Sequence, residues 1–336
     1  YEDKVNGPDT LIMMHGWTSS HEIYQKPVET LQKQARCIIY DHRGHGGSKE
    51  ANSGKPTMET LASDLNELIQ GLSLSNITLL GWSMGAGVVL NYVKLFGCDD
   101  LKQIILCDMT PKQLNDEEWK LGLYQGRYTK EEMERDAGKD FYSLYKEFAI
   151  GAVPRLAKIP GFLLRRPLKK ILAKCDEPTL KSLSASMKAQ DNRPVVGQIT
   201  VPVTYFYADP GSLFSPALAD WYKENIVTPY RAVCFPESTH MLVGDHPEKF
   251  AEEVSKVKHE SEIIEREVLT VTPDSLIADV DRMMTAHGIG GVPVVEDDKV
   301  IGIVSKRDLR AMVIRMGNKP VKSIMTHEPI VADEGI

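Results

Sequence analysis

Short apolar runs alternate with segments of helical periodicity along the first part of the chain. Residues 10–17 (TLIMMHGW), 37–48 (CIIYDHRGHGGS) and 76–85 (NITLLGWSMG) each predict an apolar strand that ends in a turn. Between them, residues 57–72 place apolar side chains three and four positions apart, which predicts an amphipathic helix. Because the strands are apolar on both faces, we expect an α/β fold with a parallel sheet covered by helices on both sides.

This alternation stops between residue 111 and about residue 195. The segment is rich in charge, is interrupted by proline, and predicts helices without a convincing strand. Strands are predicted again at 202–208 and 231–238, and an amphipathic helix follows them. The middle segment is therefore predicted to be an insertion above a completed sheet.

The pattern changes again at about residue 260. A strand, a helix, two strands around the turn EDDK and a second helix follow one another within 260–318. Residues 319–336 resemble the beginning of a second such unit. We therefore expect a large domain over 1–257, a small α+β domain over 260–318, and the start of a truncated unit over 319–336.

The charge, the cysteines and the apolar runs of the chain argue against several classes of binding partner. A formal net charge of −7 argues against nucleic-acid binding, which needs a concentrated basic surface, so a small-molecule partner is expected. The five cysteines are odd in number and lack CxxC spacing, which favours neither a disulfide framework nor a zinc site and fits a reducing, cytoplasmic location. The sequence contains no run of 18 or more apolar residues, so stable insertion into a membrane is not expected.

The segment GWSMG at 81–85 matches the pattern G-x-S-x-G between a predicted strand and a predicted helix. A sharp strand-to-helix turn lifts a serine hydroxyl clear of the sheet, and small residues at 81 and 85 avoid contact with neighbouring backbone. The helix that follows adds a positive potential at its N-terminus. Ser83 is therefore the candidate nucleophile; the alternative is an ordinary strand-to-helix turn.

Two further elements complete the chemistry of acyl transfer. A developing oxyanion needs two N–H donors, which the backbones of Met84, after the nucleophile, and Trp17, after the first apolar strand, are placed to supply. His240 lies on a loop between the last predicted strand and the closing helix, where a general base could approach Ser83. The alternative for His15 and Gly16, taken alone, is an ordinary turn.

Residues 1 to about 257 resemble the α/β-hydrolase family through the segments HGW, DHRGHGGS, GWSMGAGVVLNY and STHMLVGDHPEKFAEE. The nucleophile region and ILCDMTP are most similar to the cofactor-free haloperoxidases, perhydrolases and carboxylesterases. The resemblance implies a serine hydrolase that acts on a small ester without a cofactor, with a helical cap over 111–195. The family's first strand has no counterpart in this sequence, since Tyr1 falls inside an early hairpin.

The acidic partner of the histidine has two candidates in the sequence. In the family it usually follows the next-to-last strand in a G-x-x-D pattern, which over YADPGS places the glycine at Ala208 and the acid at Gly211. Asp209 in the same loop and Asp108 at the end of the strand ILCDMTP are the two candidates. We favour Asp108, because some relatives carry the acid after that strand, although both aspartates are also typical turn formers.

The segments HGIGGVPVVEDD (287–298) and GIVSKRDL (302–309) resemble a CBS motif, and the approach to them is similar to that of inosine monophosphate dehydrogenases. The resemblance implies an adenine nucleotide, AMP or ATP, with phosphate on Ser305, ribose on Asp308 and the base along the backbone near Ile289. Asp308 could instead only cap the helix that follows. CBS units normally pair, which implies a homodimer.

One stretch of the insertion, 153–175, is both basic and apolar. It favours either a surface that meets anionic lipid or an acidic substrate, or a solvated cap helix whose apolar face covers the active site. Two prolines within it favour the second interpretation. Its cations are Arg155, Lys158, Arg165, Arg166, Lys169, Lys170 and Lys174.

Two functions from different classes follow from these patterns. The first is a serine esterase with an appended nucleotide-sensing module, or in a variant of the same chemistry a haloperoxidase or perhydrolase. The second is a nucleotide-binding regulatory protein whose hydrolase domain is a weak or inactive ligand-binding domain, since a fold does not guarantee chemistry. The missing acid at Gly211 favours the second.

Overall fold

The structure is a computed structural model that describes residues 1–4, 9–51, 54–264, 269–286, 291–297, 299–305, 308–309 and 319–327. The chain divides into two compact units, Tyr1–Lys258 and His259–Ile336, which are described separately below.

A seven-stranded sheet forms the centre of the first unit, in the order β1-β3-β2-β4-β5-β6-β7. β1 is antiparallel to β3 at one edge and every other pair is parallel, which confirms the predicted α/β class. The strands are β1 (Glu2–Lys4), β2 (Thr10–Met14), β3 (Arg36–Tyr40), β4 (Ile77–Trp82), β5 (Leu101–Cys107), β6 (Val203–Gly211) and β7 (Tyr230–Thr239).

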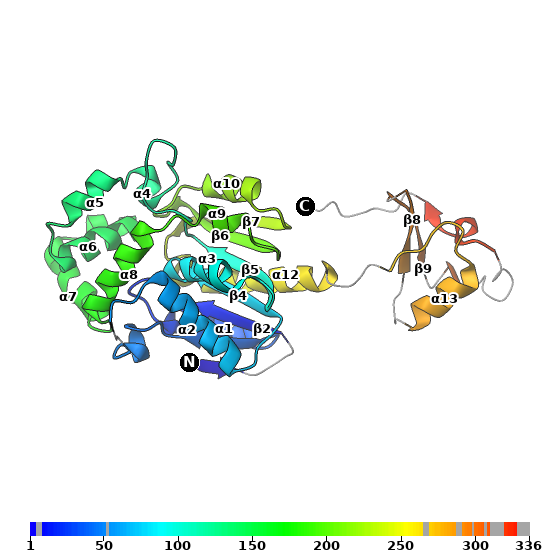
Figure 1. Ribbon diagram of the computed structural model, residues 1–336, viewed down its shortest axis with the longest axis horizontal. Helices are drawn as coiled ribbons and strands as arrows, with labels where there is room; N and C mark the ends of the chain where they lie inside the picture. Colours follow the sequence, from blue (N-terminus) through cyan, green and yellow to red (C-terminus); the bar gives the residue numbers. More distant parts are fainter. Residues whose placement is uncertain are drawn as a thin grey trace. The chain divides into compact units, whose positions relative to one another are not determined.

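Helices cover both faces of this sheet (Figure 1). Successive side chains of a strand point to opposite faces, so in β2 Ile12 packs into one apolar core and Met13 into the other. The first core includes residues of α2 (Met58–Gly71), α3 (Met84–Phe96) and α10 (Leu218–Asn225), and the second includes residues of α1 (Gln25–Leu31) and α12 (Pro247–Ile264). Three shorter elements, η1 (His21–Tyr24), η2 (Gly46–Ser48) and α11 (Leu242–Asp245), lie in loops.

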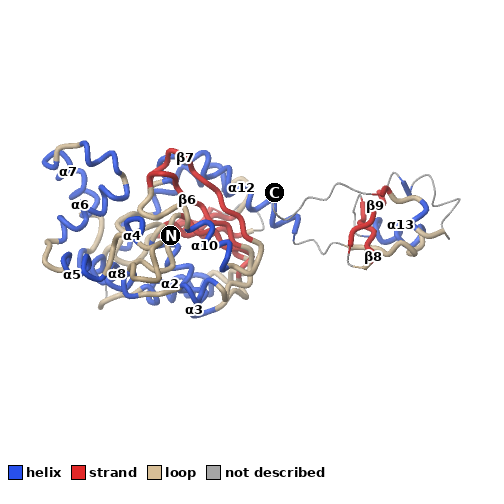
Figure 2. The backbone as a smooth tube through the Cα atoms, turned by 90° about the horizontal axis from the view of Figure 1, so that it is seen from above, coloured by secondary structure: helices blue, strands red, loops and turns tan. Residues whose placement is uncertain are grey.

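A group of helices separates β5 from β6 and forms the cap. Aspartate side chains cap the N-termini of two of these helices. Asp140 accepts from the Ser143 N–H at 3.1 Å, and Asp176 accepts from the Thr179 N–H at 3.0 Å. Figures 1 and 2 both show α5 to α8 gathered at one side of the sheet. The elements are α4 (Leu123–Gly126), α5 (Lys130–Asp136), α6 (Phe141–Ala152), η3 (Pro154–Lys158), α7 (Gly161–Leu172), α8 (Glu177–Ala189) and α9 (Arg193–Val196).

The second unit is a small α+β structure, as predicted. Its three strands are antiparallel in the order β10-β9-β8, and α13 (Ile277–Ala286) packs Val280 and Met284 into an apolar core with Val292 and Val304. The predicted second helix falls largely outside the described residues. The remaining elements are β8 (Gly291–Glu296), β9 (Lys299–Ser305), η4 (Val321–Ser323) and β10 (Thr326–His327).

Within the described ranges, none of the helices combines the length and the apolar character that crossing a membrane requires.

Candidate functional site

Ser83 occupies a strained turn between β4 and α3. Its φ of 55° and ψ of −121° lie in a region that non-glycine residues rarely adopt. Both flanking glycines are required by close backbone approach. A Cβ on Gly81 would lie 2.3 Å from the Gly85 carbonyl oxygen, and a Cβ on Gly85 would lie 2.2 Å from that of Met14. The predicted role of small residues at 81 and 85 thus has a direct steric cause.

A continuous chain of hydrogen bonds links Ser83, His240 and Asp108. The Ser83 Oγ lies 2.9 Å from the His240 Nε2, and the His240 Nδ1 lies 2.7 Å from the Asp108 Oδ2. His240 and Asp108 are each 1% exposed. Because an ionised carboxylate only accepts, it holds the proton on Nδ1 and leaves Nε2 free to accept from the serine hydroxyl.

Backbone and ring contacts fix the orientation of the histidine loop. The Trp82 indole N–H donates to the His240 carbonyl at 2.8 Å, and the His240 N–H donates to the carbonyl of Ala152 in the cap at 3.1 Å. The aromatic rings of Phe214 and Phe148 lie 5.6 and 6.4 Å from the imidazole centroid. The imidazole is therefore held by the sheet, the cap and the β6 loop together.

Asp209 lies within β6, not in the loop predicted from sequence, and it does not reach the histidine. Asp209 is exposed, is paired with Pro236 in the β6–β7 register, and is absent from the described contacts of His240. Of the two aspartates considered from sequence, only Asp108 reaches the imidazole.

Sequence reasoning missed Ser212, which follows the glycine at the position where the family pattern places the acid. Its hydroxyl donates to the Asp108 Oδ2, the same oxygen that meets His240, and its Oγ accepts from the Phe214 N–H at 3.0 Å. Ser212 is buried. The only signal in the sequence was its place directly after Gly211, since a serine in a loop has no distinctive pattern.

The loop after β2 lies against the nucleophile. A Cβ on Gly16 would lie 3.0 Å from the Ser83 Cβ, so Gly16 permits the close approach of Trp17. Met84 directly follows Ser83 as the first residue of α3. Neither the Trp17 nor the Met84 N–H donates to a backbone carbonyl in the described turns and loops. Both predicted oxyanion donors thus belong to segments adjacent to the Ser83 hydroxyl.

Three buried histidines support this loop. His15 accepts from the His42 N–H through Nε2 at 3.1 Å and donates through Nδ1 to the Gly16 carbonyl at 2.8 Å. Burial lowers the pKa of His15 to about 3 and that of His45 to about 4, and it also lowers the pKa of His42 well below its ordinary value. All three rings are therefore neutral at pH 7.

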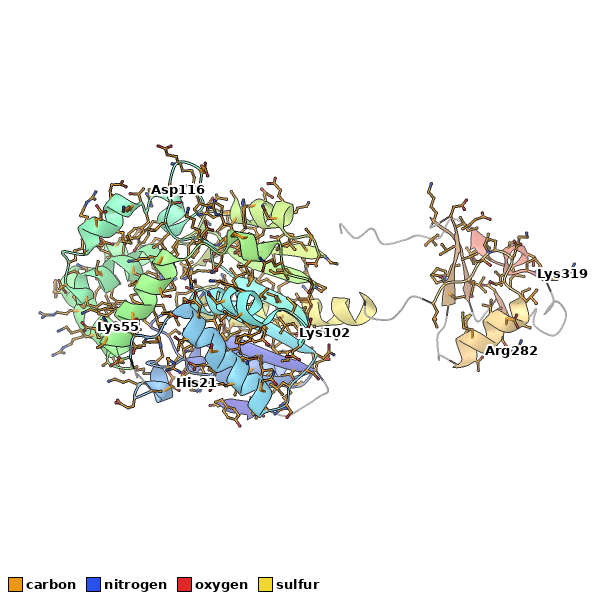
Figure 3. All side chains as sticks on the ribbon, in the orientation of Figure 1. His21, Lys55, Lys102, Asp116, Arg282 and Lys319 are labelled. Carbon is orange, nitrogen blue, oxygen red and sulfur yellow. The ribbon has the colours of Figure 1, made fainter. Side chains whose placement is uncertain are left out.

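Asp41 lies between the buried His15 and the partly exposed His21. Its carboxylate accepts from the His21 backbone N–H at 2.7 Å and lies 2.9 Å from the His21 Nδ1; Figure 3 labels His21. Hydrogen bonds from His21 and Gly47 hold the pKa of Asp41 below its ordinary value against the opposing effect of burial. In the part of the chain that the structure describes, no group of three or more histidine, cysteine and carboxylate side chains could hold a metal ion.

Two cavities meet at the nucleophile, and Trp17, Ser83 and Phe148 line both of them. The first, of about 320 Å³, extends between α6 and α8 and is lined largely by apolar cap residues. The second, of about 530 Å³, also includes His240 and extends beneath α7. Volumes of this order fit small organic ligands.

In the second unit, Ser305 and Asp308 contact each other. The Ser305 N–H and hydroxyl donate to the Asp308 Oδ2 at 2.8 and 2.6 Å, and the Asp308 N–H donates to the Ser305 Oγ at 3.4 Å. This reciprocal pair of hydrogen bonds has the pattern of a capping box. Ile289 lies outside the described residues.

Comparison with known families matches both units. The family model described as the alpha/beta hydrolase fold matches residues 9–247, and that of the CBS domain matches residues 261–315. Both resemblances inferred from the sequence are thereby confirmed.

Relatives of the first unit are esterases and haloperoxidases. The chain is 24% identical over 254 residues to a pimeloyl-[acyl-carrier protein] methyl ester esterase of Nitrosomonas europaea, covering 74% of this chain and 95% of that protein. It is 34% identical over 112 residues to a putative non-heme chloroperoxidase of Synechocystis, covering 33% of this chain and 40% of that protein. A solved esterase from Exiguobacterium antarcticum superposes with a TM-score of 0.65 at 28% identity, covering 76% of this chain and 94% of that one.

A relative of the second unit comes from a different class of enzyme. The chain is 40% identical over 89 residues to an inosine-5'-monophosphate dehydrogenase of Thermoplasma acidophilum, covering 26% of this chain. The match spans only 18% of that enzyme's length.

Proposed function

Since the chain belongs to the alpha/beta hydrolase fold family, we propose that it is a serine hydrolase that cleaves small carboxylic esters through an acyl-enzyme. The observation that carries this proposal is the hydrogen-bonded chain of Ser83, His240 and Asp108 beside two ligand-sized cavities. Esterases among the relatives support the choice of an ester as the substrate.

In the proposed reaction, the Ser83 oxygen attacks the ester carbonyl while the His240 Nε2 takes the hydroxyl proton. The N–H groups of Trp17 and Met84 stabilise the oxyanion of the tetrahedral intermediate. Collapse breaks the bond to the alkoxy group, which receives the proton from His240 and leaves as an alcohol. Water then attacks the acyl-enzyme by the same steps, and the carboxylic acid is released.

Asp108 is proposed as the acid that orients the imidazole, with Ser212 as a positioning residue. The Asp108 carboxylate stabilises the imidazolium that forms during attack. Because the Ser212 hydroxyl donates to the same Oδ2, it limits rotation of the carboxylate and keeps that oxygen directed at the His240 Nδ1. Ser212 touches neither Ser83 nor His240 in the described contacts, so it acts only through Asp108.

The two cavities suggest which part of the ester lies where. The leaving alcohol must lie near the group that protonates it, and His240 lines only the larger cavity. We therefore assign the alcohol portion to the cavity beneath α7 and the acyl portion to the cavity between α6 and α8.

The second unit is proposed to bind an adenine nucleotide when it is paired with another CBS unit. Ser305 and Asp308 retain the hydroxyl and carboxylate that the family uses for phosphate and ribose, although each now serves the other in the capping box. Binding would require at least one of these hydrogen bonds to be exchanged for one to the ligand.

A second candidate activity is perhydrolysis. The similarity to the chloroperoxidase favours it, because hydrogen peroxide in place of water would attack the same acyl-enzyme and release a peracid and the free serine. Peracid formation from an acetate ester and hydrogen peroxide, measured against plain hydrolysis of the same ester, would distinguish the two reactions.

The test of the proposed function is covalent labelling combined with turnover. A fluorophosphonate should label the wild-type chain once, and Ser83→Ala should abolish both labelling and hydrolysis of nitrophenyl esters of graded acyl length. An unlabelled serine together with a melting temperature that rises with AMP would instead identify a nucleotide-binding regulatory protein with an inactive hydrolase domain.

A further inference from the structure

The cap carries a surface whose charge is opposite to that of the chain as a whole. Residues 155–174 contain seven lysines and arginines and no acidic residue, in a chain with a net charge of −7. Arg155 pairs with Asp245 at 3.4 Å and Lys174 with Glu22 at 2.7 Å. The other cations form no ion pair in the described part of the chain; they are Lys158, Arg165, Arg166, Lys169 and Lys170.

Large apolar side chains are exposed on the same segment. Phe162 is 78% exposed and Leu163 is 54% exposed, and Ile159 and Ile171 are each 40% exposed. Ile159, Phe162 and Leu163 lie within five consecutive residues, whereas Ile171 lines the larger cavity. Exposed apolar residues that gather in one place on a folded protein indicate an interaction surface.

The arrangement along α7 separates a buried face from a free one. Leu164 and Leu168, four residues apart, are buried against the rest of the cap, so α7 is already anchored without its exposed side chains. Phe162 and Arg166 are likewise four residues apart and share the outward face. Figures 1 and 2 both show α7 at the outer edge of the cap.

This helix also forms a wall of the larger cavity at the nucleophile. Leu168, Lys170 and Ile171 line that cavity together with Ser83 and His240. A surface that binds the outward face of α7 would therefore lie beside a route to the nucleophile.

We propose that α7 and the preceding turn are a docking surface for an anionic lipid interface. Phe162 and Leu163 enter the boundary between headgroups and acyl chains, while Arg165, Arg166 and Lys169 meet the lipid phosphates. The contact is peripheral and needs no membrane-spanning segment. Ester substrates that partition into such an interface would reach the cavity beneath α7 directly.

Charge complementarity and the shape of the surface favour lipid over an acidic protein. A protein partner needs a fixed groove for Phe162 and fixed carboxylates for the cations, whereas a fluid interface adapts to a protruding ring flanked by flexible basic side chains. The absence of acidic residues along 155–174 removes local repulsion from anionic headgroups.

The test is co-sedimentation of the full chain with vesicles, measured without any substrate. We expect binding to vesicles of one part phosphatidylglycerol to two parts phosphatidylcholine to exceed binding to pure phosphatidylcholine by about tenfold or more. The excess should disappear as NaCl is raised from about 0.05 M to about 0.5 M.

Two double variants separate the apolar from the charged contribution. Phe162→Ser with Leu163→Ser, and Arg165→Gln with Arg166→Gln, should each lower the partition coefficient about fivefold or more, because they alter side chains on the exposed face of α7. Val227→Ser, which alters an apolar side chain 80% exposed outside the cap, and Lys130→Gln with Arg135→Gln on α5 are controls that should change nothing.

Equal binding to charged and neutral vesicles, or equal losses in the controls, would overturn the proposal. So would absence of vesicle binding in a chain that binds polyglutamate through the same arginines, since that result identifies an acidic polypeptide as the partner. Because the assay needs no turnover, either failure leaves the proposed hydrolase activity untouched.

Discussion

Replacement of Asp108 by asparagine is the most direct test of the proposed catalytic machinery. The side chain is 1% exposed and its backbone has a φ of +46°, which asparagine tolerates as well as aspartate does. The variant therefore preserves both volume and backbone conformation. Alanine at this position would add backbone strain to the loss of the carboxylate.

The magnitude follows from the hydrogen bonds of His240. At 2.7 Å, the Asp108 Oδ2 holds the proton on Nδ1 and leaves Nε2 unprotonated, 2.9 Å from the Ser83 oxygen. An asparagine that turns its NH₂ towards Nδ1 stabilises the opposite tautomer, in which Nε2 carries the proton and cannot accept one. We expect kcat to fall by about 10⁴, equivalent to roughly 5.5 kcal/mol, with KM little changed.

The assay is nitrophenyl ester hydrolysis at pH 7.5, with Asp209→Asn as the matched control. Asp209 is exposed and makes no described contact with His240, so its variant should remain within about twofold of wild type. If both variants stay near wild type, or if Asp209→Asn has the larger effect, the proposed role of Asp108 is wrong.

Three other predictions follow from the same site. Ser212→Ala should lower kcat about tenfold and shift the pH profile, and Ser212→Thr should restore both, whereas a merely structural role would leave the profile in place. Gly85→Ala should destabilise the fold by at least about 2 kcal/mol in urea titrations, because its Cβ would meet a backbone carbonyl at 2.2 Å. Burial holds the folded-state pKa values of His15 and His45 below their unfolded values, so the stability that these two neutral rings contribute is fully present above pH 6.5 and is lost as pH falls towards 3–4. For His45 alone the loss at pH 4.5 should be about 2–3 kcal/mol, and urea midpoints that stay constant between pH 7 and 4.5 would contradict this.

The sheet could be predicted from sequence because its strands are apolar on both faces. Every residue of β2, β4 and β5 is buried, and such runs are typical of parallel strands between two helical layers. The turn at Ser83 was equally predictable, because the required glycines leave a fixed spacing in the sequence. Burial and steric limits of this kind restrict which residue types a position accepts, so they can be recognised from the sequence alone.

The contacts of the cap were beyond the reach of the sequence. Trp17 was considered only for its backbone, yet its indole N–H donates to the Leu180 carbonyl in α8 at 3.1 Å. The two residues are 163 positions apart. Likewise, the pattern at 153–175 predicted a basic cap helix, but it could not separate the buried Leu164 from the exposed Phe162, because both fit a helical period.

The G-x-x-D pattern, applied only to the end of β6, is not sufficient to locate the acid that contacts His240. β5 and β6 are parallel neighbours, with Cys107 opposite Phe206, so both strands deliver their next residues to the same edge of the sheet. The Asp108 N–H donates to the Phe206 carbonyl at 2.7 Å, which holds the end of β5 against the middle of β6. One carboxylate can therefore face His240 from either strand, provided that the other loop supplies a donor to orient it. Asp108 occupies the first place and Ser212 the second, so a carboxylate absent at 211 does not imply an inactive site.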